Sequence, residues 1–311
     1  MEAVHTPVLL EEVIQYLAPR KGGGNLMVDA TLGEGGHSYA FLSRFPDLKV
    51  IGIDIDPAIQ EIAGERLKEF GDRIRFYSGW AQNFFAAYPE ELKRPHTILI
   101  DLGISLFHYE KSGRGFSFRK DEPLDMRLDP RQGPGAADLI AAMSEHELAD
   151  LLFRNAEERY SRRIAGAIVE ARKRGALRSS RSLGELVEQA VPASYRNGPV
   201  HAATKTFMAL RIAVNGETER LRELLETALL ALEPGGRLGV ISFHSLEDRV
   251  VKELFRHKGR GCTCFPEVPI GRYTVLTPKG VAPGEAEKRV NPPSRSARLR
   301  VVEKNVVEDE S

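Results

Sequence analysis

A glycine-dense turn between an apolar run and a helical pattern constrains the fold more than any other feature of the sequence. The apolar run Leu26–Val28 leads into residues 29–38, which read Asp-Ala-Thr-Leu-Gly-Glu-Gly-Gly-His-Ser, and helical spacing follows from Tyr39. Glycines in such a turn let the backbone approach a ligand closely and adopt positive φ at little cost. A second apolar run, Val50–Ile53, ends in Asp54, whose carboxylate can accept hydrogen bonds from both hydroxyls of a ribose. The pattern predicts a nucleotide site at two strand ends.

The spacing of the glycines favours a ligand without a pyrophosphate. A dinucleotide fingerprint would place its third glycine at position 38, which is Ser38, whereas here Gly36 directly follows Gly35. S-adenosylmethionine carries no pyrophosphate, so its sites tolerate this arrangement, and a nicotinamide oxidoreductase is disfavoured. An unrelated nucleotide site of an α/β protein and a purely structural turn are the alternatives.

Later apolar runs extend the pattern to a sheet. The third, fourth and fifth strands are expected at residues 73–77, 97–100 and 237–243. Strands that alternate with helices predict a doubly wound, mostly parallel sheet, in which ligands bind beyond the carboxyl ends of the strands. Asp101 follows the fourth strand, so it should converge with Asp54 and with the turn from Gly33. His244 follows the fifth strand, which should be its neighbour.

The strand rhythm is interrupted between the fourth and fifth strands. Helical patterns instead occupy residues 145–153, 162–174, 183–191 and 202–214. This break predicts an all-helical domain inserted into the sheet domain. The expected boundaries are 111–215 for the insertion, with 1–110 and 216–311 forming the sheet domain.

Three local expectations can be tested against a structure. Thr6 should cap a first helix that has Pro7 in its first turn. Asp248 should reach back as the capping carboxylate of the helix after the fifth strand. Trp80, the only tryptophan, can either stack on a purine or belong to the core.

Charge and composition limit the compartment and the partners. The chain has 44 basic and 44 acidic residues, but the charges are unevenly distributed. Residues 154–181 include nine basic and three acidic residues, and residues 287–304 include six basic and two acidic residues. Such segments are typical of a phosphate-binding surface or of a solvated helix face. No apolar run approaches the ~18 residues of a membrane span, and the first residues lack a signal-peptide layout, so a cytoplasmic protein without a membrane partner is expected. Cys262 and Cys264 are too few for a disulfide framework or a zinc site, so no metal is expected.

Several unusual strings, in one order along nearly the whole chain, resemble the bacterial 16S rRNA cytosine-N4-methyltransferase family, also known as the MraW family. The resemblance extends from His5 to Lys304. The strings lie at residues 5–10, 33–38, 114–118, 123–127, 204–215, 235–238 and 241–249. The resemblance implies the S-adenosylmethionine-dependent methyltransferase type of fold, S-adenosylmethionine as methyl donor, and a cytidine of 16S rRNA near the decoding centre of the small ribosomal subunit as acceptor.

The resemblance also implies site residues. The family's cofactor loop matches Gly35, Gly36 and His37, its ribose-binding acid matches Asp54, and its strand-four acid matches Asp101.

The sequence departs from the family at three places. Gly79-Trp80-Ala81 stands where the family has Gly-Asn-Phe, so Trp80, or else Phe84, is expected to pack on the adenosine. His108 occupies the position of a cofactor-contacting glutamine. Many relatives carry a second Cys-x-Cys where this chain has residues 271–273, Gly-Arg-Tyr.

The chemistry expected of such an enzyme needs a hydrogen-bond acceptor for the cytosine amine, because its lone pair is delocalised into the ring. Asp101 is the first candidate, with a purely cofactor-binding role as the alternative, and His244 could orient the base or pass the proton to solvent. The base must be unstacked. We expect Phe116 and Phe118 to stack on it, unless they form a hydrophobic plug.

The phosphates of the RNA need cationic partners. Arg114, Arg127 and Arg211 are expected to hold them, and the clusters Arg162–Arg163 and Arg172–Arg174 to clamp the rRNA. A methyltransferase acting on another acceptor and a non-catalytic assembly factor that senses the cofactor are the competing functions. A monomer and a homodimer are both compatible with the sequence.

Overall fold

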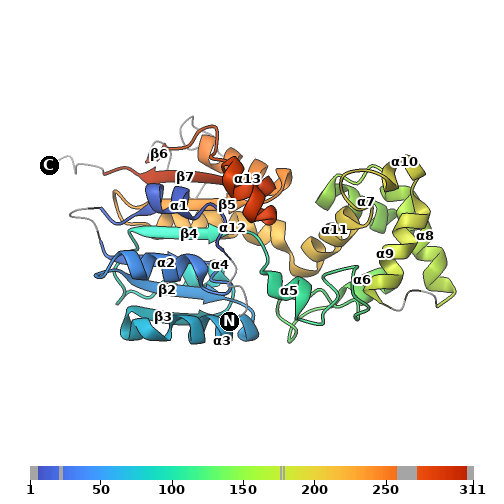
Figure 1. Ribbon diagram of the computed structural model, residues 1–311, viewed down its shortest axis with the longest axis horizontal. Coiled ribbons are helices and arrows are strands. Elements are labelled where there is room, and N and C mark those ends of the chain that lie inside the picture. Colours follow the sequence, from blue (N-terminus) through green and yellow to red (C-terminus); the bar gives the residue numbers. More distant parts are fainter. Residues whose placement is uncertain (1–5, 21–23, 176, 178, 258–271, 307–311) are drawn as a thin grey trace. The chain divides into compact units, whose positions relative to one another are not determined.

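The structure is a computed structural model that describes residues 6–20, 24–175, 177, 179–257 and 272–306 (Figure 1). The expectations for His5, Cys262 and Cys264, and for Gly271, fall outside the described residues. The chain divides into two compact units. One unit comprises residues 1–104 together with 219–311, and the other comprises residues 105–218. No helix of the described residues is long and apolar enough to cross a membrane.

The first unit is built on a mostly parallel sheet whose order is β3-β2-β1-β4-β5-β7-β6 (Figure 1). Its strands are β1 (Leu26–Asp29), β2 (Lys49–Asp54), β3 (Ile74–Ser78), β4 (Thr97–Asp101), β5 (Arg237–Ser242), β6 (Tyr273–Val275) and β7 (Arg298–Lys304). Only β7 runs antiparallel to its neighbours β5 and β6. Strand β1 pairs with both β2 and β4, so the strand order reverses there. The expected doubly wound sheet is confirmed, and the reversal is where such sheets bind ligands.

Both faces of this sheet are buried under helices. Alternate residues of a strand point to opposite faces, so Val28 belongs to one core and Met27 to the other. The first core includes side chains of α4 (Ala81–Ala86), α12 (Glu217–Ala231) and α13 (Ser245–His257). The second includes side chains of α1 (Leu10–Leu17), α2 (Gly36–Arg44) and α3 (Pro57–Leu67). The shorter elements are η1 (Lys68–Arg73), α14 (Glu285–Val290) and η2 (Pro292–Ser296). Burial on both faces explains why the central strands are uniformly apolar.

The start of α1 differs from the prediction that Thr6 caps it. The helix begins at Leu10, and Leu9 precedes it in the left-handed conformation with φ 56° and no side-chain cap. Glu287 Oε1 accepts a hydrogen bond from the Leu9 N–H at 2.8 Å, and Asn291 Nδ2 donates to the Thr6 carbonyl at 3.0 Å. The distant C-terminal segment therefore fixes this turn and satisfies the Leu9 N–H, which a Thr6 cap would otherwise have bound.

The regular elements described in the second unit are all helices, and a long loop from residue 111 to residue 135 precedes most of them. The helices are α5 (Leu106–Glu110), α6 (Ala136–Ala142), α7 (Glu145–Ala156), α8 (Ser161–Lys173), α9 (Ser180–Ala190), α10 (Ala193–Arg196) and α11 (Thr204–Asn215). Helix α7 begins with a capping box, in which Ser144 accepts from the Glu147 N–H and the Glu147 carboxylate accepts from the Ser144 N–H. The role of this unit as a separate substrate-recognition domain stays a prediction.

Candidate active site

The glycine turn after β1 depends on backbone conformation and on close packing. Gly33 and Gly35 have φ of 52° and 76°, which glycine adopts without the strain of a side chain. Gly36 starts α2, and a Cβ there would lie 2.6 Å from Pro7 Cγ. The turn therefore needs glycine at Gly36 to pack against the N-terminal segment as well as for the ligand approach predicted from sequence.

Asp54 joins the two strand ends that the sequence predicted to converge. Its Oδ2 accepts a hydrogen bond from the Gly33 N–H at 2.9 Å, and its Oδ1 accepts one from the Asp56 N–H, also at 2.9 Å. These bonds fix the carboxylate at the end of β2. Each carboxylate oxygen has a second lone pair, so the group can still accept ribose hydroxyls.

Asp101 ends β4 beside a buried histidine. Its backbone N–H donates to Thr31 Oγ1 at 2.6 Å, and its Oδ2 lies 3.8 Å from His37 Nδ1. His37 Nε2 lies 3.0 Å from the Val8 carbonyl, which can only accept, so in the neutral ring Nε2 carries the proton and Nδ1 presents a lone pair towards Asp101. A proton on either Asp101 or Nδ1 would relieve the repulsion between these two groups.

Burial sets the acidity of the two carboxyl groups in this part of the site. It raises the pKa of Asp101 to about 7, and the Asp29 and Glu247 carboxylates add to the rise while a backbone hydrogen bond from Gly103 opposes it. Burial also raises the pKa of Asp29 to about 6, although Ser38 Oγ donates to its Oδ2 at 2.6 Å. A carboxyl group that titrates near neutral pH can accept a proton in the course of a reaction.

The end of β5 carries His244 and a carboxylate that the sequence reading assigned differently. Glu247, not Asp248, caps α13: its Oε2 accepts from the Phe243 N–H at 2.8 Å and from the His244 N–H at 3.4 Å. The helix starts one residue earlier than the prediction assumed, which puts Glu247 at its third position. Asp248 instead accepts two hydrogen bonds from Arg300 on β7, at 2.7 and 2.9 Å. Glu247 Oε1 also lies 2.8 Å from His244 Nε2, and the Glu247 N–H donates to His244 Nδ1 at 3.4 Å, so this residue positions the imidazole.

Trp80 precedes α4 and is half-buried. The Arg220 guanidinium carbon lies 4.2 Å from the centre of its ring, so one face of the indole is covered by a cation. The next residue, Ala81, is buried in the core. Phe84 is 5% exposed and packs against Tyr77 and two further aromatic rings. Because Phe84 is enclosed by the core, Trp80 is the better placed of the two to contact an adenine.

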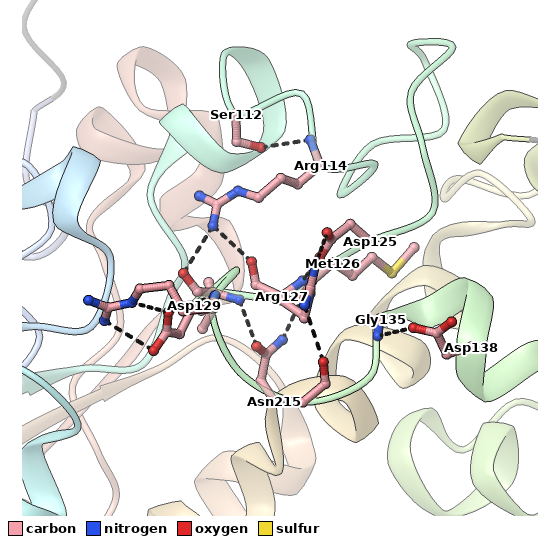
Figure 2. Close-up of polar contacts among 12 residues, drawn as sticks. Ser112, Arg114, Asp125, Met126, Arg127, Asp129, Gly135, Asp138 and Asn215 are labelled. Atoms are coloured by element: carbon pink, nitrogen blue, oxygen red, sulfur yellow. Dashed lines mark hydrogen bonds and ion pairs between the residues drawn. The ribbon is translucent and has the colours of Figure 1, made fainter.

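In the second unit the loop before α6 is held by a polar network (Figure 2). Arg114 Nη1 donates to the carbonyls of Arg127 and Leu128, at 2.8 and 2.9 Å. The Arg127 guanidinium in turn forms two hydrogen bonds with the Asp125 carboxylate, at 2.8 and 2.7 Å. Two of the arginines that were predicted to hold phosphates therefore help to shape this loop, and their binding of RNA stays a prediction.

The other predicted residues of this unit are largely packed within it. Phe116 is 4% exposed and meets the buried His108 ring edge-on, with the two centres 5.3 Å apart. Phe118 stacks on His201 at 4.1 Å. Arg211 forms two hydrogen bonds of 2.9 Å with Glu217. These contacts favour the packing alternative for the two phenylalanines. Contact of His108 with a cofactor stays a prediction.

A sequence profile of the MraW methylase family matches residues 2–305. The chain belongs to this family. A protein from Treponema denticola named Ribosomal RNA small subunit methyltransferase H is 56% identical over 98% of this chain and 98% of its own length. The protein of the same name from Treponema pallidum is 43% identical over 96% of this chain and 92% of its own length. Among solved structures, an rRNA methylase from Streptococcus thermophilus aligns with a TM-score of 0.42 at 14% identity, over 98% of this chain and 100% of its own.

Membership of the MraW family makes the chain a methyltransferase that uses S-adenosylmethionine. The residues at the end of β1 and β2 fit this cofactor, because the N–H groups of Gly33 and Asp56 fix the Asp54 carboxylate, the kind of acceptor that ribose hydroxyls bind. In the turn from Gly33 to Gly36, a Cβ would have room only at Gly33, whereas at Gly35 and Gly36 it would meet Leu67 and Pro7. Sequence reasoning missed Thr31 and Arg220, whose partners lie on other segments of the chain, and Glu247, whose partner His244 is three residues away.

The single tryptophan provides a direct test of the adenine site. Titration with S-adenosylmethionine should change the fluorescence of Trp80, and Trp80→Ala should raise the cofactor Kd about three- to tenfold, because ring stacking contributes ~0.5–1.5 kcal/mol. The Kd is measured by calorimetry in both variants. As a control, Phe84→Leu should change the cofactor Kd by less than about twofold. If Phe84→Leu raises the Kd more than Trp80→Ala does, Phe84 is the ring that stacks on the adenine.

Proposed function

We propose that the protein transfers a methyl group from S-adenosylmethionine to the exocyclic N4 of a cytidine in 16S rRNA of the small ribosomal subunit, near the decoding centre. The observation that carries the rRNA substrate is the 56% identity, over nearly the whole chain, to a protein named as a small subunit rRNA methyltransferase. The choice of N4 rests on the family resemblance of the sequence together with the acid at the end of β4. Cytosine N4 carries two hydrogens and a delocalised lone pair, so it needs an acceptor such as Asp101.

In the proposed reaction the cofactor supplies a methyl group on a sulfonium, and nitrogen displaces sulfur at that carbon. The S–C bond breaks, the N–C bond forms, and one N–H proton must leave the amine. Asp101, ionised above its pKa of about 7, accepts the hydrogen bond from this N–H and then the proton. His37 Nδ1, 3.8 Å from Asp101 Oδ2, stabilises the protonated carboxyl after the transfer. The protein otherwise contributes mainly by holding donor and acceptor in line.

His244 is the other residue to which we assign a role in this reaction. Glu247 contacts both ring nitrogens of His244, through its N–H at Nδ1 and its carboxylate at Nε2, and the same carboxylate contributes to the raised pKa of Asp101. His244 therefore belongs to the same end of the sheet as Asp101, with its ring oriented by an acidic partner. We assign it to orienting the base, with proton release to solvent as the further step that it can serve.

The experiment that tests the proposal is transfer of labelled methyl from S-adenosylmethionine to small ribosomal subunits from a strain lacking the native modification. Nucleoside analysis of the rRNA should give N4-methylcytidine, which identifies donor, acceptor and atom together. Subunits that already carry the modification are the matched control and should take up no label. Label in another nucleoside would contradict the N4 assignment, and cofactor binding without transfer to RNA would favour the assembly-factor alternative.

A further inference from the structure

An arginine in the second unit lies across two tyrosine rings. The Arg159 guanidinium carbon is 4.9 Å from the centre of the Tyr160 ring and 4.7 Å from that of Tyr195. The two rings meet edge to face with their centres 5.0 Å apart. Arg159 is exposed, and both tyrosines are partly exposed. None of these three residues has a role in the proposed methyl transfer.

A buried carboxylate fixes this cluster. Glu158 is 0% exposed, and its Oε2 accepts a hydrogen bond from the Tyr195 hydroxyl at 2.7 Å. Its Oε1 accepts from the Tyr160 N–H at 2.8 Å. Burial and the Glu158 charge raise the pKa of Tyr195, so this hydroxyl stays a donor. The Tyr195 ring is therefore held by its hydroxyl, and the Tyr160 ring packs against it, so both are ordered before any ligand arrives, which lowers the cost of binding.

Further arginines extend the cluster into a basic surface. Arg162 and Arg163 lie in the first turn of α8, directly after Tyr160, and Arg196 follows Tyr195 on α10. All three are exposed, and within the described residues neither they nor Arg159 form an ion pair. We call these four arginines and the two tyrosines the arginine–tyrosine surface.

The position of Arg162 and Arg163 is unfavourable for the helix itself. The amino end of a helix carries partial positive charge, so acidic residues stabilise it and cations destabilise it. The first turn of α8 contains no acidic residue to offset the two arginines. Helix stability therefore does not account for them, whereas binding of an anion does.

The second basic cluster of the same helix differs in each of these respects. Arg172 donates through Nη1 to the carbonyls of Ile140, Ala141 and Met143, where α6 ends. Lys173 and Arg174 pair with Glu170, and they lie at the carboxyl end of α8, where cations stabilise a helix. Of the two clusters that the sequence offered as an RNA clamp, the structure favours only the first.

We propose that the arginine–tyrosine surface binds a single-stranded segment of RNA. Guanidinium planes and aromatic rings stack on unpaired bases, and unpaired arginines bind phosphates, so both components of single-stranded recognition are present. The inference rests on the proposed function for the identity of that RNA, which would be part of the rRNA substrate.

Binding to a labelled single-stranded RNA of about a dozen nucleotides, a length within the usual site sizes, tests the proposal without any methyl transfer. Arg162→Gln/Arg163→Gln should weaken binding about tenfold and reduce the slope of log K against log salt by about 1.4, since each phosphate contact contributes ~0.7. Arg159→Gln should weaken binding about tenfold through lost stacking. Thermal unfolding should show Arg162→Gln/Arg163→Gln to be as stable as the parent or slightly more so.

The matched control is Lys173→Gln/Arg174→Gln, which removes the same two charges from the other end of α8. It should leave RNA affinity within about twofold and lower the unfolding temperature slightly, the reverse of the first variant. If the two double variants weaken RNA binding equally, the effect comes from net charge alone and the proposal is overturned. The proposal is also overturned if duplex RNA competes for the protein as well as single-stranded RNA does. If Arg162→Gln/Arg163→Gln loses RNA binding but the parent protein methylates no ribosomal subunit, the arginine–tyrosine surface is supported and the proposed function is refuted. If the parent protein methylates the subunit but this variant binds RNA as well as the parent does, the proposed function stands and the surface is refuted.

Discussion

Replacement of Asp101 by asparagine should lower the single-turnover rate of methyl transfer by about 10²–10⁴-fold and at the same time stabilise the cofactor-free protein above neutral pH. The rate falls because asparagine cannot accept the amine proton. The stability rises because the surrounding protein removes most water from the Asp101 carboxyl and raises its pKa to about 7. Rapid-quench methylation with saturating cofactor measures the first effect, and chemical denaturation at several pH values measures the second.

The sign of the stability effect follows from proton linkage. Between pH ~4 and pH ~7 the folded protein keeps a proton on Asp101 that the unfolded chain has released, so stability falls as pH rises through this range. Above pH ~7 both states are ionised and the full cost of the buried charge is present. Each unit of raised pKa corresponds to ~1.4 kcal/mol, and the side chain is partly exposed, so Asp101→Asn should gain about 1–3 kcal/mol at pH ~8 and almost nothing at pH ~4.

The same group should shape the pH dependence of the reaction. Only ionised Asp101 can accept the proton, so the single-turnover rate should rise with pH through about 7 and level off above it. Asp54→Asn is the control, because it removes the carboxylate proposed to bind the ribose at the end of β2: it should raise the cofactor Kd without abolishing the pH dependence. If Asp101→Asn raises the cofactor Kd but leaves the single-turnover rate unchanged, Asp101 only binds the cofactor and does not accept the proton.

The sequence predicts the sheet well because its central strands are buried on both faces. The runs Leu26–Val28 and Val50–Ile53 have no polar residue to compete with a strand assignment, and both lie in strands of the structure. Strand β6 was missed because it has only three residues, and its position depends on pairing with β7. Asp54 and Asp101 were identified because strand ends of a parallel sheet converge whatever the details of the loops.

The contacts that the sequence could not predict join distant segments. The left-handed turn at Leu9 depends on Glu287, which is 278 residues further along the chain. Trp80 could be assigned to neither core nor ligand, because the guanidinium that covers it belongs to Arg220. The local capping pattern also misplaced Asp248, since a shift of one residue in the start of α13 exchanges the roles of two adjacent acids. Local patterns determine the elements, and long-range pairing determines the side-chain roles.

Asn215→Ala should destabilise the second unit by about 2–4 kcal/mol and abolish methylation, while leaving cofactor affinity within about twofold. Asn215 is 6% exposed, and its Nδ2 donates to the carbonyls of Met126 and Arg211, at 2.8 and 2.9 Å. Its Oδ1 accepts from the Leu128 N–H at 2.8 Å (Figure 2). The variant removes the Asn215 side chain from the Met126 carbonyl and the Leu128 N–H of the loop.

The loop is sensitive to this loss because its backbone is strained. Met126 is fully buried, and its φ of 59° lies in the left-handed region, which costs a residue with a Cβ ~1–2 kcal/mol. Such a conformation persists only where surrounding contacts determine it, and here Asn215 and Arg114 provide them. Without Asn215 the segment from Met126 to Leu128 should relax towards ordinary φ values, and Arg127 would lose its place.

Hydrogen exchange and a matched substitution separate this local effect from general unfolding. Amides of residues 114–135 should exchange faster in Asn215→Ala, while those of strands β1 and β2, which end at the proposed cofactor-binding residues, keep their protection. Asn197→Ala makes the same change at an exposed asparagine of the same unit and should cost less than ~0.5 kcal/mol. Faster exchange throughout both units, or full methylation by Asn215→Ala, would show that the strained loop is not the element that Asn215 supports.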